Sequence, residues 1–211
     1  GSNLLFVNDF NGIVFHSKIS GIEVVEENDN DVLIRVGSGV NWDDLVAYCV
    51  EHGWYGLENL SLIPGEVGAS AVQNVGAYGV EAGELIEKVE TLRIADAKRS
   101  LFYSSECSFA YRHSVFKAEE KGRHIITYVT YRLSKTATPN IGYGALKSVL
   151  PENPSLKEIR DAIIAVRNSK LPDPKVYGNA GSFFMNPVIP MEQFVELQSR
   201  YPEIPSYPAS L

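Results

Sequence analysis

The amino-acid sequence predicts an α+β fold. Short β-type runs follow one another near the N-terminus, two clear helical patterns lie among later strands, and the regular strand–helix alternation of a doubly wound sheet is absent. With 211 residues, 45% of them hydrophobic, the chain is long enough to bury a sizeable core. The same composition argues against a largely disordered protein.

Strands are predicted where apolar and β-branched runs are bounded by Gly, Asn or Asp. The pattern places four strands near the N-terminus, then a hairpin and one long strand: residues 3–7, 12–17, 21–27, 31–39, 87–103 and 123–133. Because the first four runs follow one another without a helix between them, they favour α+β over α/β.

The first helix is predicted from Asn41 to Gly53. Asn41 is a suitable N-cap, Asp43 and Asp44 occupy the first turn, and Gly53 follows the end. One apolar face is formed by Leu45, Val46, Cys49 and Val50.

A second helix is predicted over 155–169. Ser155 and Glu158 have the spacing of a capping box, which satisfies two backbone N–H groups at a helix start. The buried stripe of this helix would be Leu156, Ile159, Ile163 and Val166. The proline-containing stretch 170–178 is the best candidate for a domain junction, and a short helix is expected near 191–200.

Composition excludes several classes of function. The net charge of −7 argues against a nucleic-acid surface. No apolar run approaches the ~20 residues of a membrane span, and the N-terminus lacks a secretion signal. Two cysteines without a CxxC pair, and four histidines without ligand spacing, predict no metal site. We therefore expect a cytoplasmic protein with no metal and no membrane insertion.

Common nucleotide and hydrolase motifs are also absent. Gly37 and Gly39 lack the third glycine of a dinucleotide fingerprint, and there is no P-loop. The serine of "NAGSF", Ser182, is not the nucleophile of a G-x-S-x-G elbow.

Residues 57–80 form a long segment rich in glycine and alanine. Its glycines would allow the backbone to approach a flat or phosphorylated ligand, and exposed N–H groups could bind a pyrophosphate. Tight turns inside a packed sheet explain the same composition equally well.

Arg112 and Ser182 are the two polar residues with the most suggestive surroundings. Arg112 lies among aromatic residues and could bind a carboxylate through its planar fork, although stacking on a ring or pairing with Glu106 would also account for it. Ser182 lies between small residues and a Phe-Phe pair, where its hydroxyl could also simply satisfy a nearby backbone group.

Taken together, several short sequence strings indicate a protein family far more specifically than any one of them does alone. They are "GSNLLF", "GLENLSLIPGEVGASAVQNVGAYG", "FAYRHSVFK", "KLPDPKVYGNAGSFFMNP" and "IPSYPA", in this order. They closely resemble the UDP-N-acetylenolpyruvoylglucosamine reductase family, also called UDP-N-acetylmuramate dehydrogenases, flavoenzymes of bacterial peptidoglycan precursor synthesis. The resemblance extends over residues 1–211.

The resemblance implies the FAD-binding fold of the vanillyl-alcohol-oxidase (PCMH) type, followed by the start of an α+β substrate-binding domain. Residues 1–20 would be the remnant of a first FAD-binding lobe, 21–171 the second lobe with a substrate flap, and 172–211 a truncated substrate-binding domain. The family's proteins are longer at both ends, so we expect a fragment that alone could lack FAD or activity. The implied FAD contacts are Ser2, Asn3, Pro64, Gly65, Gly68, Ala69, Ser70, Val72, Gly76, Tyr78 and Ile126.

The resemblance also implies a reaction. In the family, NADPH reduces the flavin, hydride passes from flavin N5 to C3 of the enolpyruvyl group, and C2 is then protonated. Ser182 matches the proton donor, and Arg112 matches the arginine that contacts the substrate carboxylate and stabilises the enolate. The implied substrate contacts are Tyr143 on the flap, Lys170, Asn186 and Tyr207. The protein would act on a small molecule in the bacterial cytoplasm, and we expect a monomer.

Two departures from the family pattern are visible. The third catalytic residue of the family, a glutamate, would lie beyond Leu211. Ala69 and Ala71 stand where other members carry serine and proline, so a hydroxyl contact to phosphate would move to Ser70 or to the backbone. Two rivals remain at this point: another flavoprotein of the same fold, such as a hydroxy-acid dehydrogenase, and a fragment that only binds or scaffolds.

Overall fold

The computed structural model describes residues 4–136, 138–142, 144–173, 176–178 and 184–206. The chain divides into two compact units, residues 1–179 and 180–211. The first unit contains the sheet and most helices, and the second contains one helix. The domain boundaries expected from the sequence stay a prediction.

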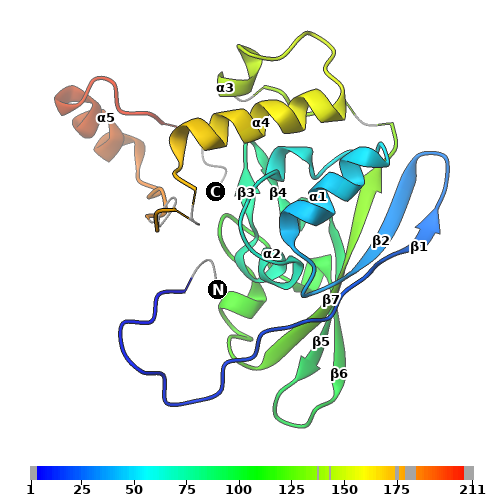
Figure 1. The fold of residues 1–211 in the computed structure, drawn as a ribbon. Coiled ribbons are helices and arrows are strands. Elements are labelled where there is room, and N and C mark those ends of the chain that lie inside the picture. Colours follow the sequence, from blue (N-terminus) through cyan, green and yellow to red (C-terminus); the bar gives the residue numbers. More distant parts are fainter. Residues whose placement is uncertain (1–3, 137, 143, 174–175, 179–183, 207–211) are drawn as a thin grey trace. The chain divides into compact units, whose positions relative to one another are not determined.

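A five-stranded antiparallel sheet forms the centre of the first unit (Figure 1), in the order β1-β2-β7-β5-β6. Its strands are β1 (Ile22–Glu27), β2 (Asp31–Gly37), β5 (Ile86–Arg93), β6 (Arg99–Tyr103) and β7 (His124–Ser134). The long strand β7 pairs with both β2 and β5, so the strand predicted over 123–133 lies at the middle of the sheet. The strands over 21–27 and 31–39 and the hairpin over 87–103 are confirmed.

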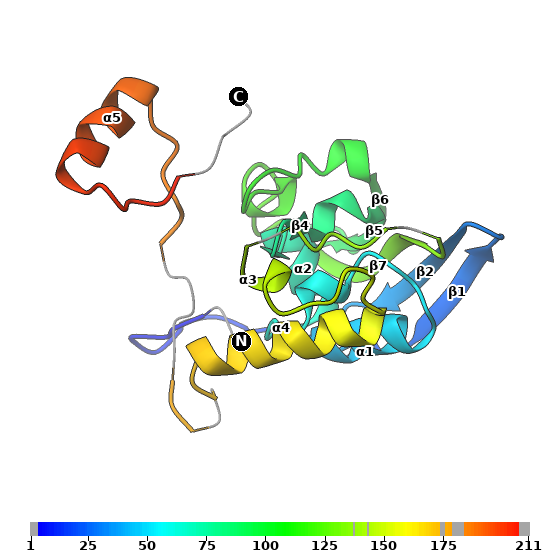
Figure 2. The ribbon, with the colours of Figure 1, turned by 90° about the horizontal axis from the view of Figure 1, so that it is seen from above.

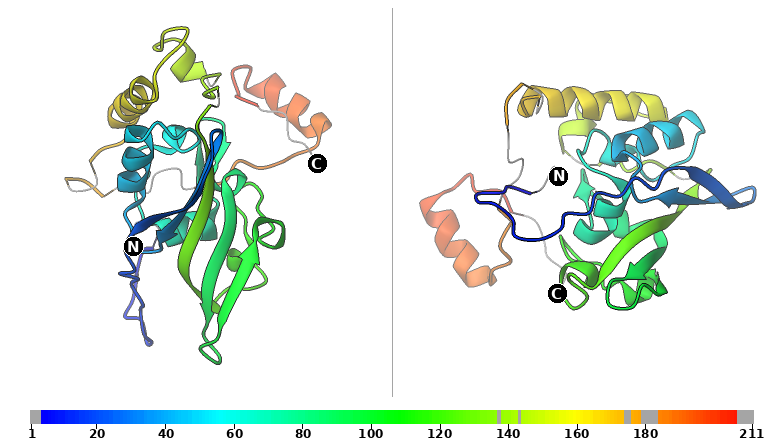
Figure 3. Two further views of the ribbon diagram at one scale, coloured as in Figure 1. Left: turned by 90° about the vertical axis from the view of Figure 1, so that its right-hand side faces the viewer. Right: turned by 60° about the horizontal axis from the view of Figure 1, so that its bottom comes forward.

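The helices are α1 (Trp42–Glu51), α2 (Val67–Gln73), α3 (Gly144–Lys147) and α4 (Leu156–Lys170). Helices α1 and α2 lie on one face of this sheet (Figure 3), and α4 packs against α1 and α3. A small hairpin and four short 3-10 turns complete the unit: β3 (Gly76–Ala77), β4 (Val80–Glu81), η1 (Glu58–Leu60), η2 (Ala82–Glu84), η3 (Ser104–Glu106) and η4 (Val115–Lys117).

The core lies between the sheet and helices α1 and α2. Alternate residues of β2, Val32, Ile34 and Val36, are fully buried, as the two-residue period of a strand requires. Trp42 of α1 meets Tyr131 of β7 edge to face, with ring centroids 6.1 Å apart. The Trp42 indole N–H donates to the Leu60 carbonyl at 2.9 Å, which satisfies the buried polar end of the ring.

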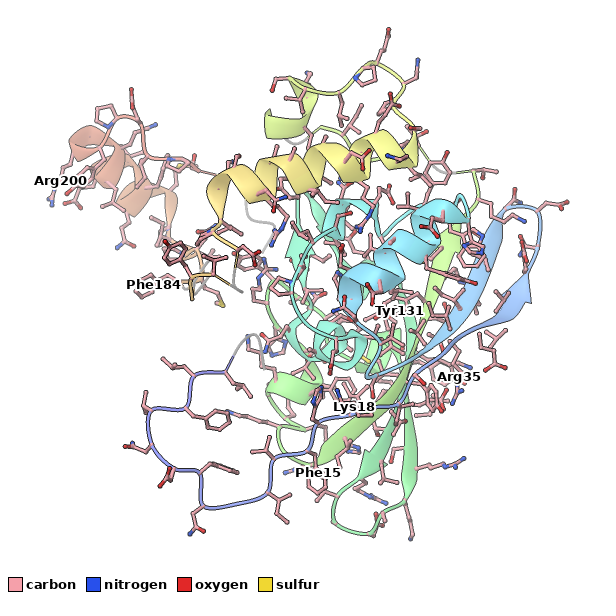
Figure 4. All side chains as sticks on the ribbon, in the orientation of Figure 1. Phe15, Lys18, Arg35, Tyr131, Phe184 and Arg200 are labelled. Carbon is pink, nitrogen blue, oxygen red and sulfur yellow. The ribbon has the colours of Figure 1, made fainter. Side chains whose placement is uncertain are left out.

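The opposite face of the sheet carries charged side chains. Arg35 of β2 donates twice to Glu90 of β5, at 2.5 and 2.8 Å, and its guanidinium lies 3.3 Å from the Tyr128 ring centroid. These contacts raise the pKa of Arg35, chiefly through the hydrogen bonds to Glu90, and lower that of Glu90. Arg35 and the core residue Tyr131 are both labelled in Figure 4.

Both strongly predicted helices are confirmed with their caps. The Asn41 side chain accepts from the N–H groups of Asp43 and Asp44, and Ser155 and Glu158 form the expected capping box. Two predicted face residues, Val50 and Val166, are only partly buried. The third predicted helix is α5 (Met191–Arg200), which is the helix of the second unit.

The first two predicted strands do not form. The described residues 4–20 contain no strand, and the apolar side chains between 4 and 15 are exposed. Residues 16–20 instead run beside the loop after β2 through isolated bonds, such as Gly39 N–H to the Ile19 carbonyl at 2.9 Å. An apolar run forms a strand only where a neighbouring strand supplies a continuous hydrogen-bonding ladder.

Helix α4 lies alongside α1 (Figure 2) and is bound to it by an ion pair. Arg160 donates to both carboxylate oxygens of Asp43, at 2.6 and 2.9 Å, and the Leu62 N–H donates to the same carboxylate at 2.6 Å. Burial alone would raise the pKa of Asp43, but the hydrogen bonds from Arg160 and Leu62 together lower it. The pair therefore stabilises the packing of α4 as long as Asp43 is ionised.

We predict that Asp43→Asn lowers the free energy of unfolding at neutral pH by about 1–2 kcal/mol, the value of a partly exposed, charge-assisted contact. A carboxyl group whose pKa is lowered by folding stabilises fully above its unfolded pKa, and this stabilisation is lost as the pH falls through the folded pKa. The difference between the two proteins should therefore shrink in acid. Urea unfolding as a function of pH measures it. Asp44→Asn, in the same first turn, is the control, and an equal loss in both variants would contradict the prediction.

Candidate active site

Four of the residues expected to bind the cofactor line one cavity of about 190 Å³. They are Gly68, Ala69 and Val72 on α2 and Ile126 on β7. These four residues, which come from distant parts of the sequence, lie close together in the folded chain, as residues that bind one ligand must.

The rest of the cavity wall was not predicted from the sequence. It is formed by Ser17, Ser38, Glu66, Phe116 and His124. The hydroxyls of Ser17 and Ser38 are 2.7 Å apart, and His16 lies 2.6 Å from Glu66 at the same end of α2. Glu66 and Phe116 lie within two of the family strings, and Ser38 lies within the "GSG" of residues 37–39, whose glycines indicate at most an incomplete dinucleotide fingerprint.

Three glycines near the cavity, Gly37, Gly39 and Gly68, leave no room for a side chain because neighbouring atoms lie very close to them. A Cβ at Gly37 would lie 2.4 Å from the Ile19 carbonyl oxygen, and one at Gly39 would lie 2.6 Å from the Ser17 carbonyl oxygen. A Cβ at Gly68 would lie 2.9 Å from the Ser38 Cβ. Three segments thus meet at the cavity at distances that only glycine allows.

We predict that Gly37→Ala lowers the free energy of unfolding by about 1–3 kcal/mol, because the clashing atoms are backbone and must move. The shift would also displace Ser17 and Ser38, so flavin retention should fall. Thermal unfolding and the flavin absorbance of the purified protein measure both effects. Gly142→Ala is the control, since its Cβ would find its nearest neighbour only at 3.8 Å. Wild-type stability and flavin content in Gly37→Ala would refute the argument.

The glycine-rich segment folds into helix α2 and the hairpin β3–β4. Its N–H groups are largely used inside the protein: those of Val67 and Gly68 donate to the carbonyls of Val40 and Ser38, both at 2.9 Å. The Ser70 hydroxyl is buried, donates to the Val67 carbonyl and lies 2.7 Å from the Tyr131 hydroxyl. Burial raises the pKa of that tyrosine. The contact of Ser70 with a cofactor stays a prediction, and its hydroxyl would have to share these bonds.

Arg112 lies at the tip of a tight turn closed by Ala110 and His113, and its φ of +56° is in the left-handed region. Its Nη2 donates to the Gly76 carbonyl at 2.8 Å, and its carbonyl accepts from Lys117 Nζ at 3.0 Å. A non-glycine residue in this conformation is uncommon and is maintained only when its surroundings hold it there. The turn therefore presents the guanidinium in a defined direction.

The contacts of Arg112 bear on the alternatives given for it: pairing with Glu106, stacking on a ring and binding of a carboxylate. Glu106 does not pair with it, because the Glu106 carboxylate accepts from the Tyr103 N–H in a capping box. The guanidinium lies 5.0 Å from the Tyr111 ring centroid and 3.9 Å from the Glu81 carboxylate. Among the described residues, its Nη1 is buried without a hydrogen-bond partner. A buried donor left in this way is suited to a ligand oxygen.

Two further residues predicted to bind the cofactor are Gly76 and Tyr78. Gly76 lies next to Arg112, and Tyr78 is linked through Asn59 to the chain before the expected flap. Gly76 accepts the hydrogen bond of Arg112, as described above. Tyr78 has a φ of +49°, and its carbonyl accepts from the fully buried Asn59 at 2.9 Å. The same Asn59 amide donates to the Asn140 carbonyl at 2.7 Å, which fixes the chain shortly before position 143.

For the remaining predicted site residues that the structure describes, it gives a position in the chain but no contact that bears on their expected roles. Pro64 and Gly65 lie on the loop before α2, Lys170 is the exposed last residue of α4, and Asn186 is exposed in the second unit. Five others lie outside the described residues: Ser2, Asn3, Tyr143, Ser182 and Tyr207. Their roles stay predictions.

Comparison with known proteins shows what this chain is similar to. Residues 1–100 match the family described as FAD binding domain. The chain is 54% identical to UDP-N-acetylenolpyruvoylglucosamine reductase of Bacteroides fragilis strain YCH46 over 209 residues, which is 98% of this chain. It is 52% identical over 211 residues to the protein of the same name from Porphyromonas gingivalis ATCC 33277. The chain is thus similar, over almost its whole length, to proteins named UDP-N-acetylenolpyruvoylglucosamine reductase.

The match does not cover the whole length of these reductases. The chain spans 63% of the Bacteroides reductase and 62% of the Porphyromonas reductase. The crystal structure of the Thermus caldophilus reductase has a similar fold, with a TM-score of 0.54 and 23% identity, over 78% of this chain and 53% of that one. The expected FAD-binding α+β fold is therefore shown for this chain.

The cavity on α2 suits part of an FAD molecule. Its volume of about 190 Å³ is below the ~300–1,000 Å³ of sites that enclose a drug-sized ligand, so it would hold only a portion of the dinucleotide. Its wall combines apolar Val72 and Ile126 with the hydroxyls of Ser17 and Ser38, a mixture that fits both a ring system and its polar substituents.

Two further features are absent from the described part of the chain. No group of three or more His, Cys, Asp or Glu is placed to hold a metal ion there. Nor does any helix in the described ranges have the length and apolar character needed to cross a membrane.

Proposed function

We propose that the protein containing this chain is an FAD-dependent oxidoreductase that reduces UDP-N-acetylglucosamine enolpyruvate to UDP-N-acetylmuramate for peptidoglycan synthesis. NADPH is the proposed hydride donor, and the bacterial cytoplasm and a monomeric state are part of the proposal. The similarity to these reductases and the match to the FAD-binding domain support it.

One observation in the structure supports this reaction above others: the buried, unpartnered Nη1 of Arg112. The substrate carries a carboxylate next to the carbon that must receive a proton. A guanidinium that donates from Nη2 to Gly76, and whose Nη1 makes no hydrogen bond among the described residues, can donate from Nη1 to that carboxylate. As negative charge develops on the group during reduction, the same hydrogen bond strengthens.

The other proposed roles follow from the family resemblance. When bound, FAD supplies the hydride that reaches C3 of the enolpyruvyl group. Ser182 then donates its hydroxyl proton to C2 while the carboxylate is held by Arg112. Lys170, Tyr143, Asn186 and Tyr207 are the proposed contacts of the UDP-sugar.

The test is a titration of the purified protein, at its natural length, with the UDP-enolpyruvyl substrate while the flavin absorbance near ~450 nm is followed. We expect bound flavin, a spectral change on substrate binding, and NADPH oxidation only in the presence of substrate. Bound flavin with turnover of a 2-hydroxy acid instead would identify a different flavoprotein of the same fold. The absence of flavin from a folded protein would remove the oxidoreductase proposal altogether.

A further inference from the structure

The carboxylate of Glu81 faces the guanidinium of Arg112 from the end of strand β4. The Oε1 of Glu81 lies 3.9 Å from Arg112 Nη1, and both side chains are about one-third exposed or less. They meet over Gly76, where an added Cβ would lie 3.0 Å from both Arg112 Nη1 and Glu81 Cγ. The two side chains thus share a space that exists because residue 76 has no side chain.

Asn74 holds both partners in place. It ends α2 with a φ of +42°, and its Nδ2 donates to Glu81 Oε2 at 2.7 Å and to the Ala110 carbonyl at 2.8 Å. Its Oδ1 accepts from the Gly83 N–H at 2.8 Å. One buried amide therefore connects the segment that carries Glu81 to the turn that carries Arg112.

The separation of Glu81 and Arg112 has a chemical consequence. At 3.9 Å the charges attract, but the distance exceeds that of a hydrogen bond, so the donors of Nη1 are left unused. A closer carboxylate would occupy this nitrogen and compete with a ligand. A more distant one would leave the guanidinium fixed only by the bond from Nη2 to Gly76.

We propose that Glu81, held by Asn74, is a positioning residue that orients Nη1 of Arg112 toward the carboxylate of the substrate without taking its hydrogen bond. The inference rests on the proposed function and adds a residue to it. It assigns Glu81 a role through Arg112 and no contact with the reacting atoms.

The decisive variant is Glu81→Gln. The Gln oxygen can still accept from Asn74, which then turns the Gln amide N–H₂ toward Arg112 Nη1, donor against donor. The guanidinium should move away from its position. We expect the dissociation constant of UDP-N-acetylglucosamine enolpyruvate to rise at least about tenfold, the effect of losing one charge-assisted hydrogen bond. That of UDP-N-acetylglucosamine, which lacks the carboxylate, should change by less than about twofold.

Binding is measured by flavin absorbance or calorimetry in the holoprotein at its natural length, so turnover is not needed. Glu84→Gln is the matched control, since Glu84 lines the same neighbouring cavity of about 370 Å³ as Glu81 and no contact with Arg112 is seen for it among the described residues. In an Arg112→Lys background, Glu81→Gln should have little further effect, because the two residues act through one hydrogen bond. Glu81→Asp keeps the charge and should recover part of the discrimination even if Glu81→Gln folds poorly.

The outcomes are distinguishable. A wild-type protein that binds both ligands equally would remove the proposed function, and the role of Glu81 with it. A wild-type protein that prefers the carboxylate ligand, with the same preference retained in Glu81→Gln, would leave the function standing and overturn the positioning role. Equal weakening of both ligands in Glu81→Gln would also overturn it, since that is the result of a general structural defect.

Discussion

Arg112→Lys is expected to lower kcat/KM for the enolpyruvyl substrate about 10²–10³-fold, the loss seen when one preorganised donor to a developing oxyanion is removed. Lysine retains the positive charge, but it is a flexible point charge and cannot donate to Gly76 and to a ligand from one rigid plane. Because the interaction strengthens as charge develops, the loss should appear in kcat as well as in KM.

Steady-state kinetics with NADPH oxidation as the readout measures this effect. Arg123→Lys is the matched control, because Arg123 is exposed and, within the described part of the chain, forms its ion pair with Glu120. Flavin reduction by NADPH without substrate should be the same in both variants. An Arg112→Lys protein with wild-type kcat/KM would place carboxylate recognition elsewhere in the protein.

Ser182→Ala is expected to lower kcat about 10²–10⁴-fold, the contribution of a positioned general acid. Ser182 lies outside the described residues, so this prediction rests on the family resemblance and on the chemistry of the step. The reduced product needs a proton at C2, and alanine cannot supply one. Substrate binding and flavin content should remain close to those of the wild-type protein.

Single-turnover experiments separate the two halves of this prediction. NADPH should still reduce the flavin at the wild-type rate, while formation of UDP-N-acetylmuramate slows. Ser199→Ala is a control from the second unit, since its hydroxyl donates to the Glu196 carbonyl within its own helix. If Ser182→Ala and Ser199→Ala retained equal activity, another group would have to be the proton donor.

Local patterns predicted the elements whose causes are local. The caps at Asn41 and Ser155 involve residues two or three positions apart, and both helices begin where these residues place them. The hairpin over 86–103 and the long strand β7 follow from alternating apolar residues in the same way. The apolar runs at 3–7 and 12–17 failed as strands because a strand needs a partner that the run itself does not specify.

The candidate site shows the same division. Gly68, Ala69, Val72 and Gly76 stand in one family string and Arg112 stands in another, whereas Ile126 lies on the strand that follows. Their neighbours Ser17, Ser38 and His124 stand in no such string with a ligand-binding reading, and only the packing of three segments brings them to the cavity. Glu81 would be read from sequence as an ordinary surface carboxylate.

By itself, the sequence determined the α+β class, the capped helices, the resemblance to a family of reductases and the residues expected to perform the reaction. Only the tertiary structure decided how Arg112 is held: at positive φ, bonded to Gly76, facing Glu81 at 3.9 Å, with one nitrogen left without a hydrogen bond. The physical reason is the distance along the sequence over which each kind of interaction acts. Capping and periodicity act between residues a few positions apart, whereas the direction of a guanidinium depends on groups brought together from distant parts of the chain.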